Sequence, residues 1–327
     1  RGIVLTDEEK RPAPGKLPAD WKPLARFDSV VSLDETKMAA LRAGQLAAAF
    51  GGEFAGLPVR KPATLPSGKM KLVDRILKLD PKGGRYGLGL AVGDMDIHPE
   101  DWHLICHFKD DNVMPGTLMY ECCLHTLRVH LMRMGWIGEE GRLVHEPVPG
   151  ISSQLKCRGQ VLASTKKARY ELHIKELGYG PKPFCIADAF MFADDKMIVQ
   201  ITDMSVQLSG ATRPELESLW SGSQDFVPGS GPSYVRSKAL YGPKEILAYS
   251  NGNPSEAFGE RYLPFDQDRI LARLPGPPYQ FLDRIVAVQG DQWVLKPGAS
   301  AVAEYDVPVD ACYFKENGQA TLPFAVL

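Results

Sequence analysis

The sequence lacks the features that mark membrane-spanning, secreted and nucleic-acid-binding proteins. It has no run of about 18 uncharged apolar residues, so we expect no segment to span a membrane. Its formal net charge is −2, and no cluster of Lys or Arg predicts binding to nucleic acid or to a membrane surface. Acidic residues interrupt the apolar residues near the start, so no signal peptide is expected. Because Arg1 stands where a Met would begin a chain, we interpret the sequence as part of a longer polypeptide.

Cysteines are few, and their spacing fits neither a disulfide framework nor a metal site. The six cysteines show no paired spacing, which favours a reduced, cytoplasmic protein. Cys122 and Cys123 stand near His125 and His130, but the four make no zinc pattern, so we predict no metal. No Gly-rich loop stands between a strand and a helix, which argues against a nucleotide cofactor.

One short stretch carries the residues for a proton-transfer site. His107 is followed by the turn Met114-Pro115-Gly116 and then by Glu121, inside a largely apolar segment that runs to Trp136. Pro and Gly at this turn predict a helix start, where the first backbone N–H groups have no partner in the helix. A carboxyl group within a buried segment is a candidate proton donor. The stretch therefore combines a base, an acid and a set of N–H donors.

The same stretch resembles the active-site segment of the β-hydroxyacyl-ACP dehydratases with the hotdog fold. That pattern has His-Phe, a short polar loop, Val-Met-Pro-Gly and an acid fourteen residues after the His, as here from His107 to Glu121. The likeness covers residues 65–208 and is closest to the β-hydroxydecanoyl-ACP dehydratase/isomerase group. It departs at Lys109, Asp110 and Asn112 in the loop, and Glu replaces the Asp typical of isomerising members. Isomerase activity is therefore left open.

The resemblance implies a role for each residue. His107 is the base that removes the α-proton of a β-hydroxyacyl thioester. The Gly116 N–H, held in the turn by Met114 and Pro115, is the oxyanion donor. Glu121, or its equivalent from a facing copy, protonates the departing hydroxyl group, and no cofactor is required.

The pattern of elements predicts an α+β fold in which an antiparallel sheet wraps around a long helix. We expect a short helix at 34–50, strands at 71–77 and 85–92, and the long helix at 113–134. Four further strands are expected, separated by turn clusters, at 154–162, 168–174, 184–192 and 197–208. Together they form a hotdog domain at 34–210. Pro-rich, Gly-rich or charged segments at 1–33 and 211–240 are interpreted as linkers.

The chain then repeats itself, which predicts a second, incomplete hotdog copy at 241–327. The segments at 43–54 and 65–76 are echoed about 208 and 209 positions later. Further on, His107-Phe108-Lys109 is matched with Tyr313-Phe314-Lys315, and Met114-Pro115 with Leu322-Pro323. A phenol is a poor base at neutral pH, so this copy is interpreted as an inactive partner that ends as its central helix begins.

Tandem hotdogs of this kind resemble the paired dehydratase regions of polyunsaturated fatty acid synthases and polyketide-type megasynthases. The resemblance implies an acyl carrier protein and other synthase domains as partners, and a homodimer is possible. Two alternatives stay open. A hotdog acyl thioesterase has no need for a His and an acid in this arrangement, and a non-catalytic structural module fits the second copy better than the first.

Overall fold

The computed structural model describes residues 15–221, 237–291, 294, 296–308, 311–318, 322–323 and 326. Within these ranges no helix is long and apolar enough to cross a membrane. The predicted start of the first linker (residues 1–14) and the middle of the second (222–236) lie outside the described residues.

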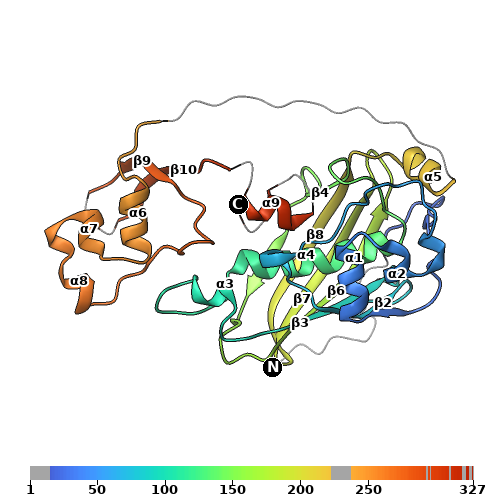
Figure 1. The fold of residues 1–327 in the computed structure, drawn as a ribbon, viewed down its shortest axis with the longest axis horizontal. Helices are drawn as coiled ribbons and strands as arrows, with labels where there is room; N and C mark the ends of the chain where they lie inside the picture. Colours follow the sequence, from blue (N-terminus) through green and yellow to red (C-terminus); the bar gives the residue numbers. More distant parts are fainter. Residues whose placement is uncertain are drawn as a thin grey trace, which may run out of the picture.

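A long helix, α4 (Gly116–Arg133), lies at the centre of the fold. It begins directly after Pro115, as the turn predicted, and nearly all of its side chains are buried, the polar ones included. Figure 1 shows the helix lying across the long strands of the sheet. A helix buried on almost every side explains why its sequence is apolar without a polar stripe.

The sheet is antiparallel and has eight strands in the order β1-β2-β3-β6-β7-β8-β4, with β5 paired to β8. Its strands are β1 (Val31–Leu33), β2 (Arg75–Asp80), β3 (Leu90–Asp96), β4 (Val144–Glu146), β5 (Gln154–Cys157), β6 (Lys167–Gly178), β7 (Phe184–Ala193) and β8 (Lys196–Ser209). An antiparallel sheet packed around one buried helix is the hotdog arrangement. The predicted α+β class and the long meander of the last three strands are confirmed.

Parts of both predicted linkers are folded, although residues 237–240 are exposed and lie in no helix or strand. Ala25 and Phe27 are buried, and β1 pairs with β2, so residues 15–33 are part of the first domain. Within 211–240, residues Arg213–Ser221 form helix α5 and bury Leu216 and Leu219. These short apolar elements gain their stability from tertiary packing, which composition does not reveal.

The C-terminal segment repeats the elements of the first domain in the same order. Helices α1 (Glu35–Arg42) and α2 (Leu46–Phe50) and the turn η1 (Gly52–Phe54) recur 208 positions later as α6 (Pro243–Ser250), α7 (Pro254–Phe258) and η3 (Glu260–Tyr262). One aromatic pair recurs with them. The ring centroids of Phe50 and Phe54 lie 4.9 Å apart, and so do those of Phe258 and Tyr262.

The hairpin that follows also recurs, down to its irregularity. Strands β9 (Arg284–Gln289) and β10 (Ser300–Glu304) pair as β2 and β3 do, with Arg284 opposite Glu304 as Arg75 is opposite Asp94. In both hairpins the register then shifts directly after the Ile that follows the Arg, Ile76 in β2 and Ile285 in β9. The remaining helical elements are η2 (Gly68–Met70), α3 (Trp102–Ile105), α8 (Pro264–Gln267) and α9 (Cys312–Asn317).

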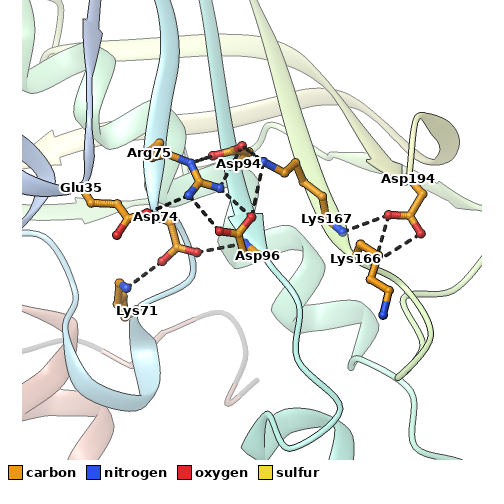
Figure 2. A network of polar contacts seen from close by, with 9 residues as sticks. All are labelled: Glu35, Lys71, Asp74, Arg75, Asp94, Asp96, Lys166, Lys167 and Asp194. Carbon is orange, nitrogen blue, oxygen red and sulfur yellow. Dashed lines mark hydrogen bonds and ion pairs between the residues drawn. The ribbon is translucent and has the colours of Figure 1, made fainter.

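An ionic network at the base of the first hairpin is built again in the second. Figure 2 shows Arg75 between two carboxylates, with Nε 2.9 Å from Asp94 Oδ1 and Nη2 2.7 Å from Asp96 Oδ1. In the second hairpin, Arg284 Nε lies 2.7 Å from Glu304, and the same guanidinium binds Asp306. The backbone N–H groups of Asp96 and Asp306 each donate to the carboxylate of the Asp just before the Arg, Asp74 and Asp283 respectively.

Candidate functional site

His107 lies half-buried in the loop between α3 and α4, and its ring is held by the same loop. Its Nδ1 lies 2.9 Å from the carbonyl oxygen of Val113, and the Val113 N–H donates back to the His107 carbonyl at 2.9 Å. A carbonyl oxygen can only accept, so Nδ1 carries the proton in this contact. The neutral ring then has an unprotonated Nε2, which is the atom that can act as a base.

The turn that ends this loop presents a backbone N–H at a helix start. The Met114 N–H donates to the carbonyl of Val161 at 3.0 Å, which ties the turn to the segment before β6. Met114 and Pro115 are buried, whereas Gly116, the first residue of α4, is exposed. A side chain at Gly116 would meet no atom of the described residues within 4 Å, so there is open space beside its backbone. Helix starts favour negative charge, so this space suits an oxyanion.

Glu121 is buried at 1 % exposure and lies in different surroundings. Its Oε2 is 3.2 Å from Nε2 of His125, one helical turn further on. It lines a small cavity of about 50 Å³ together with Arg128, Asn317 and Pro323, and His107 is not among the lining residues. The structure therefore brings the predicted base and oxyanion donor into one loop and sets the predicted acid against the C-terminal segment.

Burial governs the charges around Glu121. Desolvation lowers the pKa of His125, against the opposing effect of the adjacent carboxylate. It also lowers the pKa of Arg128 to about 10, so this guanidinium stays charged at neutral pH. Arg133, near the end of the same helix, binds Glu53 at 2.8 Å. In the described part of the chain, no group of three or more His, Cys, Asp or Glu side chains could hold a metal ion.

Comparison with known proteins now adds to this geometry. Residues 65–202 match the family model of the FabA-like domain. Residues 65–202 are therefore similar to a FabA-like domain, and this part of the chain is called the FabA-like domain below. The chain is also 34% identical, over 209 residues, to one subunit of the polyunsaturated fatty acid synthase of Thraustochytrium sp. (strain ATCC 26185 / S-3). That match covers 63% of this chain but 14% of the relative, so the chain spans a small part of that protein.

Two solved structures share a low overall similarity with the chain. One is the TT0310 protein of Thermus thermophilus, with a TM-score of 0.28 and 13% identity over 40% of this chain and 88% of that one. The other is a hypothetical thioesterase from Streptococcus pneumoniae, with a TM-score of 0.28 and 9% identity over 42% of this chain and 89% of that one.

Two matching contacts join the FabA-like domain to the C-terminal segment. The Gly276 N–H donates to the carbonyl of Cys106 at 3.0 Å, and the Ser67 N–H donates to the carbonyl of Glu316 at 2.5 Å. Ser67 and Gly276 hold the same place in the two repeats. In each repeat, the loop that precedes the hairpin therefore binds the other repeat. In the FabA-like domain, the residue that accepts this bond stands directly before His107.

These contacts correct the sequence alignment of the second copy. Because Cys106 and Glu316 accept equivalent bonds, the residue that corresponds to His107 is Asn317, which agrees with the spacing of β3 and β10. The predicted match with Tyr313 is wrong. Tyr313 lies inside α9, is buried and contacts the hydroxyl of Tyr305 at 2.9 Å.

Sequence reasoning missed one residue beside His107. The ring of Tyr279 stands nearly perpendicular to the His107 ring, with centroids 5.8 Å apart, and its hydroxyl contacts Thr117 Oγ1 in the first turn of α4. Tyr279 belongs to the C-terminal repeat, at the place that Met70 holds in the FabA-like domain. The repeat offset could have paired the two positions, but nothing in the sequence puts Tyr279 next to His107.

Proposed function

We propose that this chain dehydrates a β-hydroxyacyl thioester, carried on an acyl carrier protein, to the trans-2-enoyl thioester. The FabA-like domain and the similarity to part of a polyunsaturated fatty acid synthase support dehydratase chemistry in general. The observation that carries the specific proposal is the bond from His107 Nδ1 to the carbonyl of Val113, three residues before Gly116. That bond leaves Nε2 unprotonated in the neutral ring, and we propose the Gly116 N–H as the oxyanion donor.

In the proposed mechanism every step moves a proton. Nε2 of His107 takes the α-proton, and the electron pair shifts toward the thioester carbonyl oxygen. The Gly116 N–H stabilises the negative charge that develops on that oxygen, and Met114 and Pro115 hold the turn that presents it. An acid then gives its proton to the β-hydroxyl group, which leaves as water while the double bond forms.

We propose that this acid comes from a facing copy of the fold. Glu121 lines a cavity with Asn317 and Pro323, which supports placing it opposite the second repeat rather than beside its own His107. Two sources remain. One is the position equivalent to Glu121 in the central helix of a second unit, and the other is Glu121 of another chain in a homodimer.

We also propose that residues 241–327 begin a second hotdog unit, so that the protein carries a tandem hotdog. The recurring helices, the hairpin with its shifted register, the ionic network and the reciprocal docking contacts all support this. Asn317 in place of His107 supports a unit without dehydratase chemistry of its own.

An open apolar face on the C-terminal segment fits the same proposal. Beside the hairpin is a groove of about 260 Å³ lined largely by apolar residues, including Tyr241, Ile285 and Val288. Their equivalents Leu33, Ile76 and Leu79 are fully buried in the FabA-like domain. We propose that the remaining helix and strands of the second unit cover this groove.

The proposed partners are the acyl carrier protein and neighbouring domains of a synthase, in the cytoplasm. No cofactor is proposed, since proton transfer requires none. The rival functions are a hotdog acyl thioesterase and a non-catalytic structural module.

Incubation of the full-length protein with a 3-hydroxyacyl thioester, and separately with the trans-2-enoyl thioester, distinguishes these functions. Mass spectrometry of the acyl products and a thiol assay are the two measurements. Interconversion of the two thioesters, lost in the His107→Ala variant, is the expected result. Release of free thiol instead would make the protein a thioesterase, and no change in either thioester would favour the structural module. A cis-3 product from the trans-2-enoyl thioester would add isomerase activity.

A further inference from the structure

We infer that Tyr279, contributed by the second unit, is a positioning residue that holds the His107 ring and the start of α4 in their working arrangement. This inference rests on the proposed function and extends it. It assigns to the unit without a catalytic His a direct part in the site of the unit that has one.

The contacts of Tyr279 join the two halves of the proposed machinery. Its ring stands nearly perpendicular to the His107 ring, with centroids 5.8 Å apart. Its hydroxyl contacts Oγ1 of Thr117, the residue after Gly116. One side chain therefore touches both the base and the helix turn that carries the oxyanion donor.

The surroundings of Tyr279 leave its ring little freedom. Its centroid lies 6.0 Å from that of Trp102 and 4.9 Å from that of Phe281, and the side chain is buried. The backbone around it is fixed as well, because the Gly276 N–H donates to Cys106, the residue before His107. Burial raises the pKa of Tyr279 to about 12, so the phenol stays protonated at neutral pH. A neutral phenol can keep the contact with Thr117 throughout a proton-transfer cycle.

The other repeat supplies an internal comparison. Met70 holds the place of Tyr279 in the FabA-like domain, and its loop docks ahead of Asn317. Met has no hydroxyl group to contact a helix turn. Tyr279 thus lies beside His107, whereas Met70 belongs to the loop that contacts the residue before Asn317.

The first test removes the hydroxyl group alone. In the full-length protein, Tyr279→Phe and Thr117→Val should each lower kcat by about tenfold or more while KM changes little, because small displacements of reacting groups are costly. The double variant should be no slower than the slower single variant, since both remove one contact. Tyr249→Phe is the matched control, because it removes a phenol that donates to Ala272, away from His107.

The second test does not depend on turnover. Tyr279→Leu removes the ring from the edge of His107, so labelling of His107 by diethyl pyrocarbonate, followed by peptide mass spectrometry, should become several-fold faster. Labelling of His98, whose side chain is 67% exposed, is the internal reference and should not change.

The outcomes separate the two proposals. An active wild-type protein with wild-type kcat in Tyr279→Phe, or an unchanged labelling rate in Tyr279→Leu, overturns the role of Tyr279 alone. A wild-type protein that leaves both thioesters unchanged overturns the dehydratase proposal, and the labelling rate then decides whether Tyr279 positions His107.

Discussion

Arg128 donates hydrogen bonds to the backbone carbonyl oxygen of Asn317 at 3.4 Å and to its side-chain oxygen at 3.3 Å. Arg128 belongs to the central helix of the FabA-like domain, and Asn317 stands in the second repeat where His107 stands in the first. The same guanidinium donates to the carbonyl of Thr64 at 3.1 Å. Asn317 is therefore held by the central helix of the first repeat, whereas the half-buried His107 ring contacts Tyr279 of the second repeat.

Replacing His107 by Ala should abolish dehydration while the fold is retained. Loss of a general base typically costs about 10²–10⁴-fold in rate. The measurement is the initial rate with a 3-hydroxyacyl thioester, alongside a thermal unfolding curve. His98→Ala is the control, since this exposed histidine lies outside the site. Near wild-type turnover by a folded His107→Ala protein would remove His107 from the mechanism.

Replacing Glu121 by Gln separates the two proposed sources of the acid. With the acid on the second unit, which the cavity shared by Glu121 and Asn317 favours, the rate should stay within about threefold of wild type. The thermal midpoint should fall, because the change removes a buried carboxylate beside His125 and Arg128. Initial rates and unfolding curves of the same preparation provide the measurement. A loss of about a hundredfold would mean that Glu121 serves His107, through a second chain.

Replacing Arg128 by Met should destabilise the protein strongly. The change leaves the oxygens of Asn317 and Thr64 without this donor, and it removes a buried positive charge near Glu121. Breaking a buried charged contact on one side typically costs about 3–5 kcal/mol. Urea unfolding followed by circular dichroism measures the change.

Arg26→Met is the control for this variant. Arg26 binds Asp28 at 2.8 Å, but both side chains are mostly exposed, and ion pairs screened by water contribute little to stability. Equal losses in the two variants would contradict a special role for the Arg128 contact.

The ionic network of Figure 2 predicts a loss of stability in acid. The hydrogen bond from Arg75 lowers the pKa of Asp96 to about 2. The pKa is lower in the folded state than the ordinary value of about 3.9, so the stabilisation is complete above that value and is lost as the pH falls toward 2. Urea unfolding between about pH 5 and pH 2 should show this decline. The Asp96→Asn variant should lose less stability than the wild type as the pH falls. In a protein that already carries Arg75→Gln, adding Asp96→Asn should make no such difference.

How far the sequence predicts this structure depends on the range of the interactions. The long helix and strands β6 to β8 could be predicted because each carries enough apolar and turn residues to be recognised alone. Strands β1 and β4, with three residues each, were missed because their pairing partners are distant in the sequence. Strand β3 was expected at 85–92 but spans Leu90–Asp96, because its apolar residues begin before the residues that pair with neighbouring strands.

The candidate site shows the same division. His107, the turn before α4 and Gly116 are neighbours along the chain, so a local motif could place them together. Tyr279 reaches the site only because the second repeat docks there, and no local pattern contains that information. Asn317 was misassigned because Tyr313-Phe314-Lys315 resembles His107-Phe108-Lys109 in residue type, while the backbone contacts follow a different spacing.

Replacing Gly116 by Ala should lower activity without unfolding the protein. No atom of the residues that the structure describes lies within 4 Å of the position of the added methyl group. Gly116 has no positive φ either, so the native backbone can accept Ala. In the proposed mechanism the thioester oxygen approaches the Gly116 N–H through this open space, which the methyl group would then occupy. Losing one oxyanion donor typically costs about 10²–10³-fold in kcat. Kinetics with a 3-hydroxyacyl thioester measure the effect, and Gly52→Ala is the control because that glycine also has open space around it but lies in η1. A Gly116→Ala protein with unchanged kcat would show that the oxyanion donor lies elsewhere.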